Sequence, residues 1–99
     1  MVTKVEIKRS HLPHKKYNAV IDGRKTIPFG QRSAEDFTMH RDQARKENYL
    51  RRHKPNEDWN DPKSAGFYSR WVTWNKPTLR GSVADLNKKF KNLEVTLKV

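Results

Sequence analysis

The sequence predicts an α+β fold, a small antiparallel sheet in βββ-ααα-β order with helices packed on one of its faces. Three observations predict this class. Apolar and polar residues alternate in the first thirty residues, helix-forming stretches fill residues 42–90, and alternation returns from residue 93. A chain of 99 residues is expected to form a single domain over residues 1–99.

Three strands are expected in the N-terminal third. Residues 3–8 and 16–21 alternate in polarity, which is typical of half-buried strands. Asp22-Gly23 then predicts a tight hairpin, because a type I′ turn requires a positive φ at both central residues. The return strand covers residues 24–29. Pro28 predicts that this strand ends there or lies at a sheet edge, since proline donates no ladder hydrogen bond.

The next segment, residues 30–39, carries no regular pattern and is expected to be irregular. A helix is expected over residues 42–53, which are rich in good helix formers. Asp42 suits the start of this helix, both as a cap and as a negative charge at the positive end of the helix dipole. Lys54-Pro55 ends it, because the residue before a proline avoids the α conformation.

Residues 59–77 hold all three tryptophans of the chain and are expected to form the centre of the core. Asp61-Pro62 predicts the start of a helix, and Phe67, Trp71 and Trp74 follow at helical spacing. Rings in this arrangement could instead stack on nucleic-acid bases. We favour the core, because a chain with few aliphatic residues needs its aromatic rings inside.

A further helix and a last strand complete the expected fold. Ser82 to Asp85 resembles a capping box and predicts a helix whose inner stripe is Val83, Leu86 and Phe90. Residues 93–99 show the clearest alternation in the chain. Because the two terminal strands have similar patterns, we expect them to lie side by side.

The net charge is +11, and its distribution is uneven. Residues 1–33 carry +6, residues 34–66 carry zero and residues 67–99 carry +5. Such an excess implies an acidic partner, which could be nucleic acid, an anionic membrane face or an acidic protein surface. The chain has no cysteine, so a disulfide framework, a cysteine zinc site and a thiol nucleophile are excluded.

The histidines indicate little chemistry. His11 and His14 supply two ligands where a metal site takes three or four. His40, Asp42 and His53 could form a metal-dependent nuclease site, but no metal-finger signature accompanies them, so we favour paired or stacked structural histidines. No Gly-rich phosphate loop or catalytic-triad spacing is present. We therefore expect no enzymatic activity, no metal or other cofactor, and no small-molecule substrate.

Basic residues gather around the helix expected over residues 42–53. Arg41, Arg45 and Arg52 share one helical face, which could neutralise phosphates of a nucleic acid. The alternative is a solvated helix whose arginines pair with the acidic loop at 56–61. The candidate residues for binding a partner or nucleic acid are Arg41, Arg45, Arg51, Arg52, Lys54, Tyr68, Arg70 and Lys76.

Four motifs stand out in the second half of the chain. They are Tyr49-x-x-Arg52-His53, Glu57-x-Trp59-x-Asp61, Ala65-Gly66-Phe67-Tyr68-Ser69-Arg70-Trp71 and Trp74-Asn75-Lys76-Pro77-Thr78-Leu79. Together with Phe29-Gly30 and His40-x-Asp42 upstream, this pattern resembles a family of small basic proteins of nucleocytoplasmic large DNA viruses, of the chlorella-virus, mimivirus and marseillevirus kind. That family has no assigned activity, so the resemblance implies no catalytic residues. It implies a viral product made in the host cytoplasm and packaged in the virion.

The leading expectation is a non-enzymatic virion structural protein, a minor capsid or internal component that cements larger capsid proteins. Its partners would be other virion proteins, with contact to an anionic inner membrane also open but no membrane span. The alternative is a basic DNA-binding or genome-packaging protein.

Overall fold

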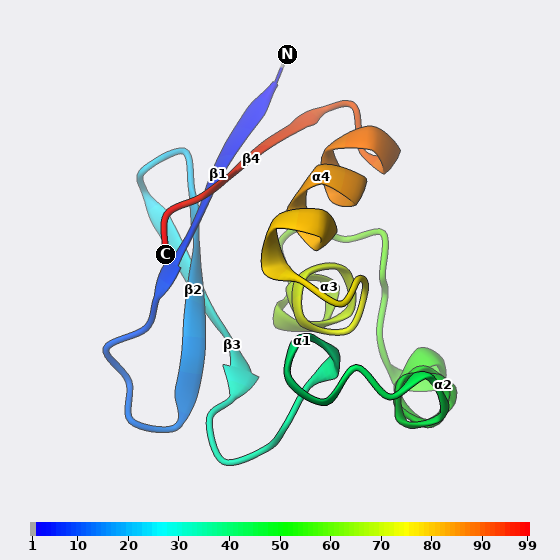
Figure 1. Ribbon diagram of the computed structural model, residues 1–99. Coiled ribbons are helices and arrows are strands. Elements are labelled where there is room, and N and C mark those ends of the chain that lie inside the picture. The colour runs from blue at the N-terminus through cyan, green and yellow to red at the C-terminus, as the bar shows by residue number, and fades with distance from the viewer. Residues whose placement is uncertain (1) are drawn as a thin grey trace.

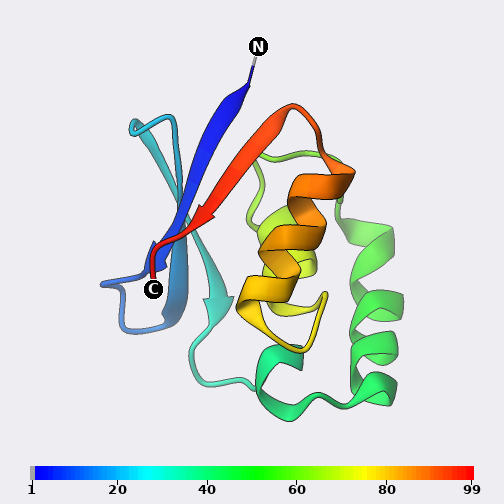
Figure 2. The same ribbon diagram turned by 45° about the horizontal axis from the view of Figure 1, so that its top comes forward.

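The computed structural model describes residues 2–99 and confirms the α+β class (Figure 1). A four-stranded mixed sheet forms one layer, and the helices cover one face of it. Helix α2 lies farthest from the sheet in both views (Figure 2). In chain order the elements are β1 (Thr3–Arg9), β2 (Lys15–Ile21), β3 (Lys25–Gln31), α1 (Phe37–His40), α2 (Gln43–His53), the short 3-10 turn η1 (Lys54–Asn56), α3 (Ala65–Tyr68), the π-helical turn η2 (Ser69–Thr73), α4 (Leu79–Lys89) and β4 (Leu93–Leu97).

The N-terminal hairpins follow the sequence pattern closely. β2 pairs antiparallel with both β1 and β3, in the order β3-β2-β1-β4. Asp22 and Gly23 have φ values of 52° and 68°, as a type I′ turn requires. Pro28 lies within β3, which runs on to Gln31 and is an edge strand of the sheet. An edge position tolerates proline, because no neighbouring strand is left without its donor.

The last strand corrects one expectation. β4 lies beside β1 as predicted, but the two strands run parallel, with Val5 opposite Val95, so the sheet is mixed and not wholly antiparallel. Alternation in polarity identifies a strand without giving its direction. The helices between β3 and β4 supply the long crossover that a parallel neighbour needs. On the outer side of β4, the Asn87 side chain donates to the Val95 carbonyl and accepts from its N–H, at 2.9 and 2.8 Å.

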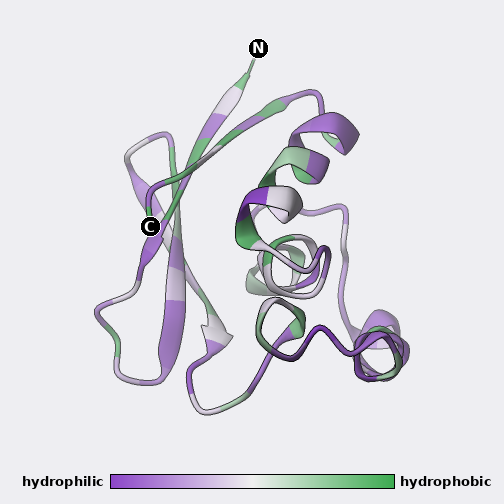
Figure 3. Ribbon diagram, in the orientation of Figure 1, coloured by the Kyte–Doolittle hydropathy of each residue, from purple (hydrophilic) through white to green (hydrophobic). Residues whose placement is uncertain are grey.

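The core lies between the sheet and the helices α3 and α4. Phe29, Phe67, Tyr68 and Leu86 are fully buried there. Burying a side chain of this size stabilises the fold by about 1.5–3 kcal/mol. Figure 3 shows hydrophobic segments in the strands and in α3 and α4, whereas α2 is mostly hydrophilic. The core therefore fixes the sheet and two helices, and α2 needs a different anchor.

Helix α1 was not expected, since residues 30–39 carry no periodic pattern. It forms because Asp36 caps it, accepting a hydrogen bond from the Thr38 N–H at 3.0 Å. The Asp36 carboxylate is almost completely buried and also forms a salt bridge with Lys16 Nζ at 2.7 Å. A single turn of helix offers too few residues for a recognisable pattern, and its partner on β2 is distant in sequence.

Two helix starts also differ from the prediction. α3 begins at Ala65 with Ser64 as its cap, because the Ser64 hydroxyl accepts from the Phe67 N–H, while Asp61 only forms a turn before it. The helix then widens into η2, so Phe67, Trp71 and Trp74 do not lie on one regular α-helical stripe. α4 begins at Leu79 and is capped by Thr78, four residues before Ser82, the cap of the expected capping box.

Candidate binding groove

Helix α2 is positioned by its start, by Lys46, whose ammonium donates to the Asn75 carbonyl at 2.6 Å, and by one aromatic side chain. The Asp42 carboxylate caps it as predicted, accepting from the N–H groups of Ala44 and Arg45. Tyr49 is the side chain that α2 buries. Its ring stacks on Trp74, with centroids 4.2 Å apart and planes 4° apart. This contact anchors α2 to the loop after η2 and leaves the arginines of the helix at the surface.

Four rings form a continuous column through this region. His40 packs on Trp74 with centroids 5.3 Å apart, and His53 stacks on Tyr49 at 4.1 Å. The order is therefore His40, Trp74, Tyr49, His53, which we call the aromatic column. The prediction of stacked structural histidines is confirmed in this form. Two rings separate the histidines, so the arrangement does not assemble them with Asp42 into a shared metal site.

The end of the column is fixed by Glu57. Its carboxylate lies 3.1 Å from His53 Nδ1 and accepts a hydrogen bond from Trp59 Nε1 at 2.8 Å. Gly66 packs directly against it, since a Cβ at this position would come 2.9 Å from the Glu57 Cδ. Burial, followed by the nearby Glu57 charge, raises the pKa of Tyr49 to about 12.

Arg70 and Tyr68 were predicted to contact partners, and the burial of Tyr68 contradicts this prediction for Tyr68. The Arg70 guanidinium lies over the rings of Trp71 and Trp59, at 4.2 and 5.3 Å, and donates to the Trp74 carbonyl. Its burial lowers its pKa. Tyr68 is fully buried, and burial raises the pKa of its hydroxyl. The Tyr68 side chain therefore belongs to the interior, and the half-buried Arg70 packs its guanidinium on tryptophan rings. Their neighbours in sequence gave no sign of which way they would point.

The same contacts occupy the tryptophan rings. Trp59 and Trp71 lie against Arg70, and Lys89 Nζ lies 5.1 Å from the centre of Trp71. Trp74 is covered by Tyr49 and His40. The expected core role holds for Phe67, Tyr68 and Val72, whereas Trp71 is only partly buried against the core and Trp59 and Trp74 lie outside it. Their occupied ring faces do not favour a base-stacking platform.

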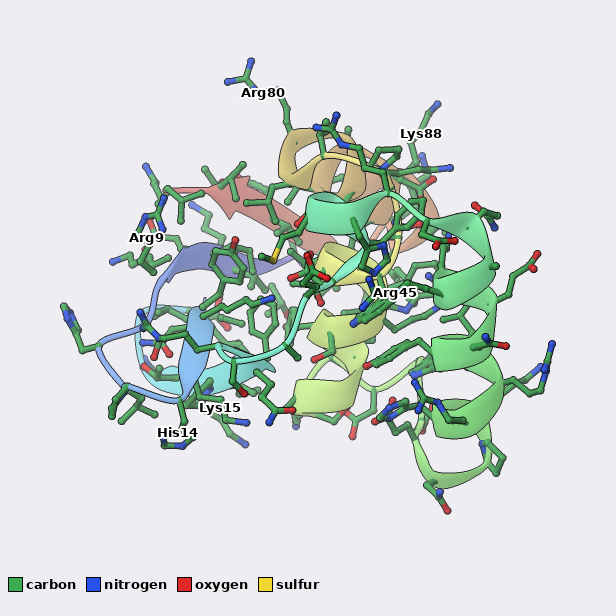
Figure 4. All side chains as sticks on the ribbon, turned by 60° about the horizontal axis from the view of Figure 1, so that its bottom comes forward. Arg9, His14, Lys15, Arg45, Arg80 and Lys88 are labelled. Carbon is green, nitrogen blue, oxygen red and sulfur yellow. The ribbon has the colours of Figure 1, made fainter. Side chains whose placement is uncertain are left out.

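An open groove of about 1100 Å³ lies between the sheet side and α2. One wall is formed by the start of β2, the end of β3 and the segment that leads to α1. The other wall is α2, and residues of α3 and η2 form the floor with Trp74. Figure 4 shows Lys15 on the sheet side and Arg45 on the helix side.

The groove is lined by charged side chains that are only partly paired. Its cations are Lys15, Lys16, Arg45, Arg51 and Arg52, and its carboxylates are Glu35, Asp36 and Glu57. Arg45 pairs with Glu35 at 3.1 Å, and Lys16 pairs with Asp36. Within residues 2–99, Lys15, Arg51 and Arg52 form no salt bridge. Cations from both walls thus remain available to a ligand.

The structure therefore brings together three of the predicted residues, Arg45, Arg51 and Arg52. Arg41 is exposed elsewhere and donates to the Pro77 carbonyl at 3.3 Å. Lys54 and Lys76 are also exposed but do not line the groove. Sequence reasoning missed Lys15 and Lys16, because only the folded sheet brings the start of β2 opposite α2. The adjacent pair of lysines was the one signal available.

The loop with His11 and His14 is held by hydrogen bonds from the Arg32 side chain to its backbone. The Arg32 guanidinium donates to the carbonyls of Ser10, Leu12 and Lys15, the shortest at 2.7 Å. Both histidines are exposed at its surface. In the described part of the chain, no group of three or more His, Cys, Asp or Glu side chains is placed to hold a metal ion.

None of the helices within residues 2–99 has the length and apolar character required to cross a bilayer.

A family of unknown function (DUF5754) matches residues 5–53, which is just under half of the chain. The matched region begins in β1 and ends with α2, so it includes both walls of the groove but only part of the aromatic column. No curated protein and no solved structure matches the chain.

Proposed function

We propose that the protein is a non-enzymatic structural component of the virion of a large DNA virus, a minor capsid or internal protein that holds larger virion proteins together. The observation that carries this proposal is the groove with cations on both walls that the fold leaves unpaired. A protein that joins acidic surfaces needs such cations, since complementary charge guides and orients association. Catalytic chemistry is not part of the proposal.

The viral context of the proposal rests on the sequence motifs between Tyr49 and Leu79. Several of their members build the aromatic column and its Glu57 end, which support the α2 wall. If other members of the viral family also need α2 held in place, this need would account for the motifs between Tyr49 and Leu79. The proposed location is the virion, with synthesis and assembly in the host cytoplasm. The +11 charge is also compatible with contact to an anionic inner membrane.

The proposal is tested in virus particles. Quantitative mass spectrometry of purified virions, before and after stepwise removal of outer layers, is expected to find the protein at constant stoichiometry in one layer. Deleting the gene is expected to give fragile or incomplete capsids. Intact and infectious particles that lack the protein would overturn the proposal.

A second candidate function is binding of the viral genome. It is favoured by the arginines of α2, because Arg45, Arg51 and Arg52 all border one groove. Such binding would weaken steeply with salt, as each phosphate contact releases a counterion. A salt titration with duplex and single-stranded DNA separates the two functions. Tight binding with a steep salt slope supports the second, and association with a capsid protein that persists in high salt supports the first.

A further inference from the structure

We propose that the groove docks an extended, acidic peptide segment of a larger partner protein. This inference rests on the proposed function and assigns the surface through which the protein would join its neighbours. It follows from three properties of the groove: the charges that line it, its size and the occupied faces of its aromatic rings.

The unpaired cations suit carboxylates. Lys15 projects from the sheet side, and Arg51 and Arg52 come from α2 on the other side. Arginine binds a carboxylate through two parallel N–H donors, which fixes direction as well as charge. A chain lying between the walls can therefore place acidic side chains against cations on both sides.

The carboxylates of the groove distinguish a peptide from a nucleic acid. Glu35, Asp36 and Glu57 all line it, among the cations. A nucleic-acid backbone carries a negative charge at every unit and would bring phosphates close to these groups. A peptide instead offers neutral N–H donors between its acidic side chains, and the exposed Glu35 carboxylate can accept from them, whereas Asp36 and Glu57 already bind partners within the protein. The mixture of charges therefore favours a peptide.

Size and ring contacts point the same way. The groove is open to solvent and has a volume of about 1100 Å³, which leaves room for one extended chain between its walls. An extended peptide strand needs about 5 by 10 Å in cross-section, so one strand fits. A single nucleic-acid strand would fit by size, but it gains much of its affinity from stacking on aromatic faces. Trp74 and Tyr49 already cover one another.

The walls are also held before a ligand arrives. The Lys16–Asp36 salt bridge joins β2 to the cap of α1, and the Tyr49–Trp74 stack anchors α2. A site that is already formed loses little conformational entropy when it binds. A short segment could thus bind with useful affinity.

The test uses a fluorescein-labelled peptide of alternating Glu and Gly, about ten residues long, enough to cross the 36 Å length of the molecule. Binding to the full chain is measured by fluorescence anisotropy at physiological ionic strength. A version of the peptide with Gln in place of Glu tests whether binding needs the negative charges. A single-stranded thymidine oligonucleotide with the same charge as the peptide tests whether a nucleic acid binds instead.

Two double variants make the test specific. Arg51→Glu with Arg52→Glu reverses two exposed charges in the groove, and Arg80→Glu with Lys88→Glu makes the same charge change on α4, where both side chains point away into solvent (Figure 4). Circular dichroism checks that each variant is folded. We expect the groove variant to bind the acidic peptide at least about tenfold more weakly and the α4 variant to stay within about threefold of the wild type.

Three results would overturn the groove assignment, and a fourth would overturn only the proposed function. Equal losses in the two variants would mean attraction by overall charge alone. No binding of the acidic peptide, or equal binding of its Gln version, would exclude a site for acidic segments. Tighter binding of the oligonucleotide, lost in the groove variant, would make nucleic acid the occupant. Peptide binding by a protein absent from virions would instead refute the proposed function and leave the groove assignment intact.

Discussion

Tyr49 and Trp74 lie face to face, with ring centroids 4.2 Å apart and planes 4° apart, and this stack holds α2 to the rest of the protein. The other side chains of α2 are exposed or only half-buried. The stack therefore links the core region to the wall that carries Arg45, Arg51 and Arg52. A binding surface made mostly of charged groups can keep a fixed shape only if such an anchor lies beneath it.

Replacing Trp74 by alanine is expected to destabilise the protein by about 3 kcal/mol, because it removes a large ring and two ring contacts. Denaturant unfolding measures the loss. Hydrogen exchange should show α2 losing protection before the sheet does. Trp74→Phe keeps a ring in the column and is expected to cost about 1 kcal/mol. If α2 stayed as protected from hydrogen exchange in Trp74→Ala as in the wild type, the stack would not be the anchor of α2.

Gly66 and Glu57 are expected to be coupled. Gly66→Ala places a Cβ 2.9 Å from Glu57 Cδ, and Glu57 cannot easily move because it binds both His53 and Trp59. We expect a loss of about 1–2 kcal/mol from this overlap, even though alanine favours a helix by up to about 1 kcal/mol. In a Glu57→Ala background the same change should become neutral or stabilising. A double-mutant cycle measures the difference, and additive effects would contradict the assigned contact.

Arg70→Lys is expected to lower stability by about 1 kcal/mol while leaving ligand binding unchanged. Lysine carries the same charge, but it cannot stack a planar guanidinium on Trp71. Arg51→Lys, on the exposed side of α2, serves as the matched control and should not alter stability. Thermal unfolding and peptide anisotropy give the two readouts. A binding defect in a fully stable Arg70→Lys protein would return Arg70 to the partner surface.

Stability is expected to fall as the pH rises above about 10. The pKa of Tyr49 is raised in the folded state to about 12, so its neutral form is favoured there. The stabilisation from neutral Tyr49 is complete below about pH 10, the pKa of tyrosine in the unfolded chain. It is lost as the pH approaches about 12, at up to about 1.4 kcal/mol of unfolding free energy per pH unit. Urea unfolding from about pH 9 to about pH 11 measures it against Tyr49→Phe, which lacks this titration. Equal losses in both proteins would contradict the assigned role of Tyr49.

Short local patterns predicted much of the fold. Asp22-Gly23 located a hairpin, Asp42 located the start of α2, and the alternation after Leu93 located β4. Each of these depends on a few adjacent residues. The direction of β4 and the cap at Asp36 depend on contacts between distant segments, which no local pattern contains.

The candidate site was predictable only on the helix. A periodic pattern shows which arginines share a face of α2, and Arg45 and Arg52 do border the groove. The opposite wall, with Lys15, is created by the sheet. Tyr68 was misassigned because its exposure is decided by the packing beside η2, where the helix departs from regular α-helical geometry.

The central claim is that acidic chains bind in the groove between the sheet side and α2. The most direct measurement is an NMR titration of the ¹⁵N-labelled protein with the Glu-Gly peptide, read as backbone amide shifts. The account predicts saturable shifts concentrated at groove residues such as Gly30, Ser33, Asn48 and Arg52. Shifts centred on α4 around Arg80 and Lys88, or spread evenly over all basic surfaces, would contradict it.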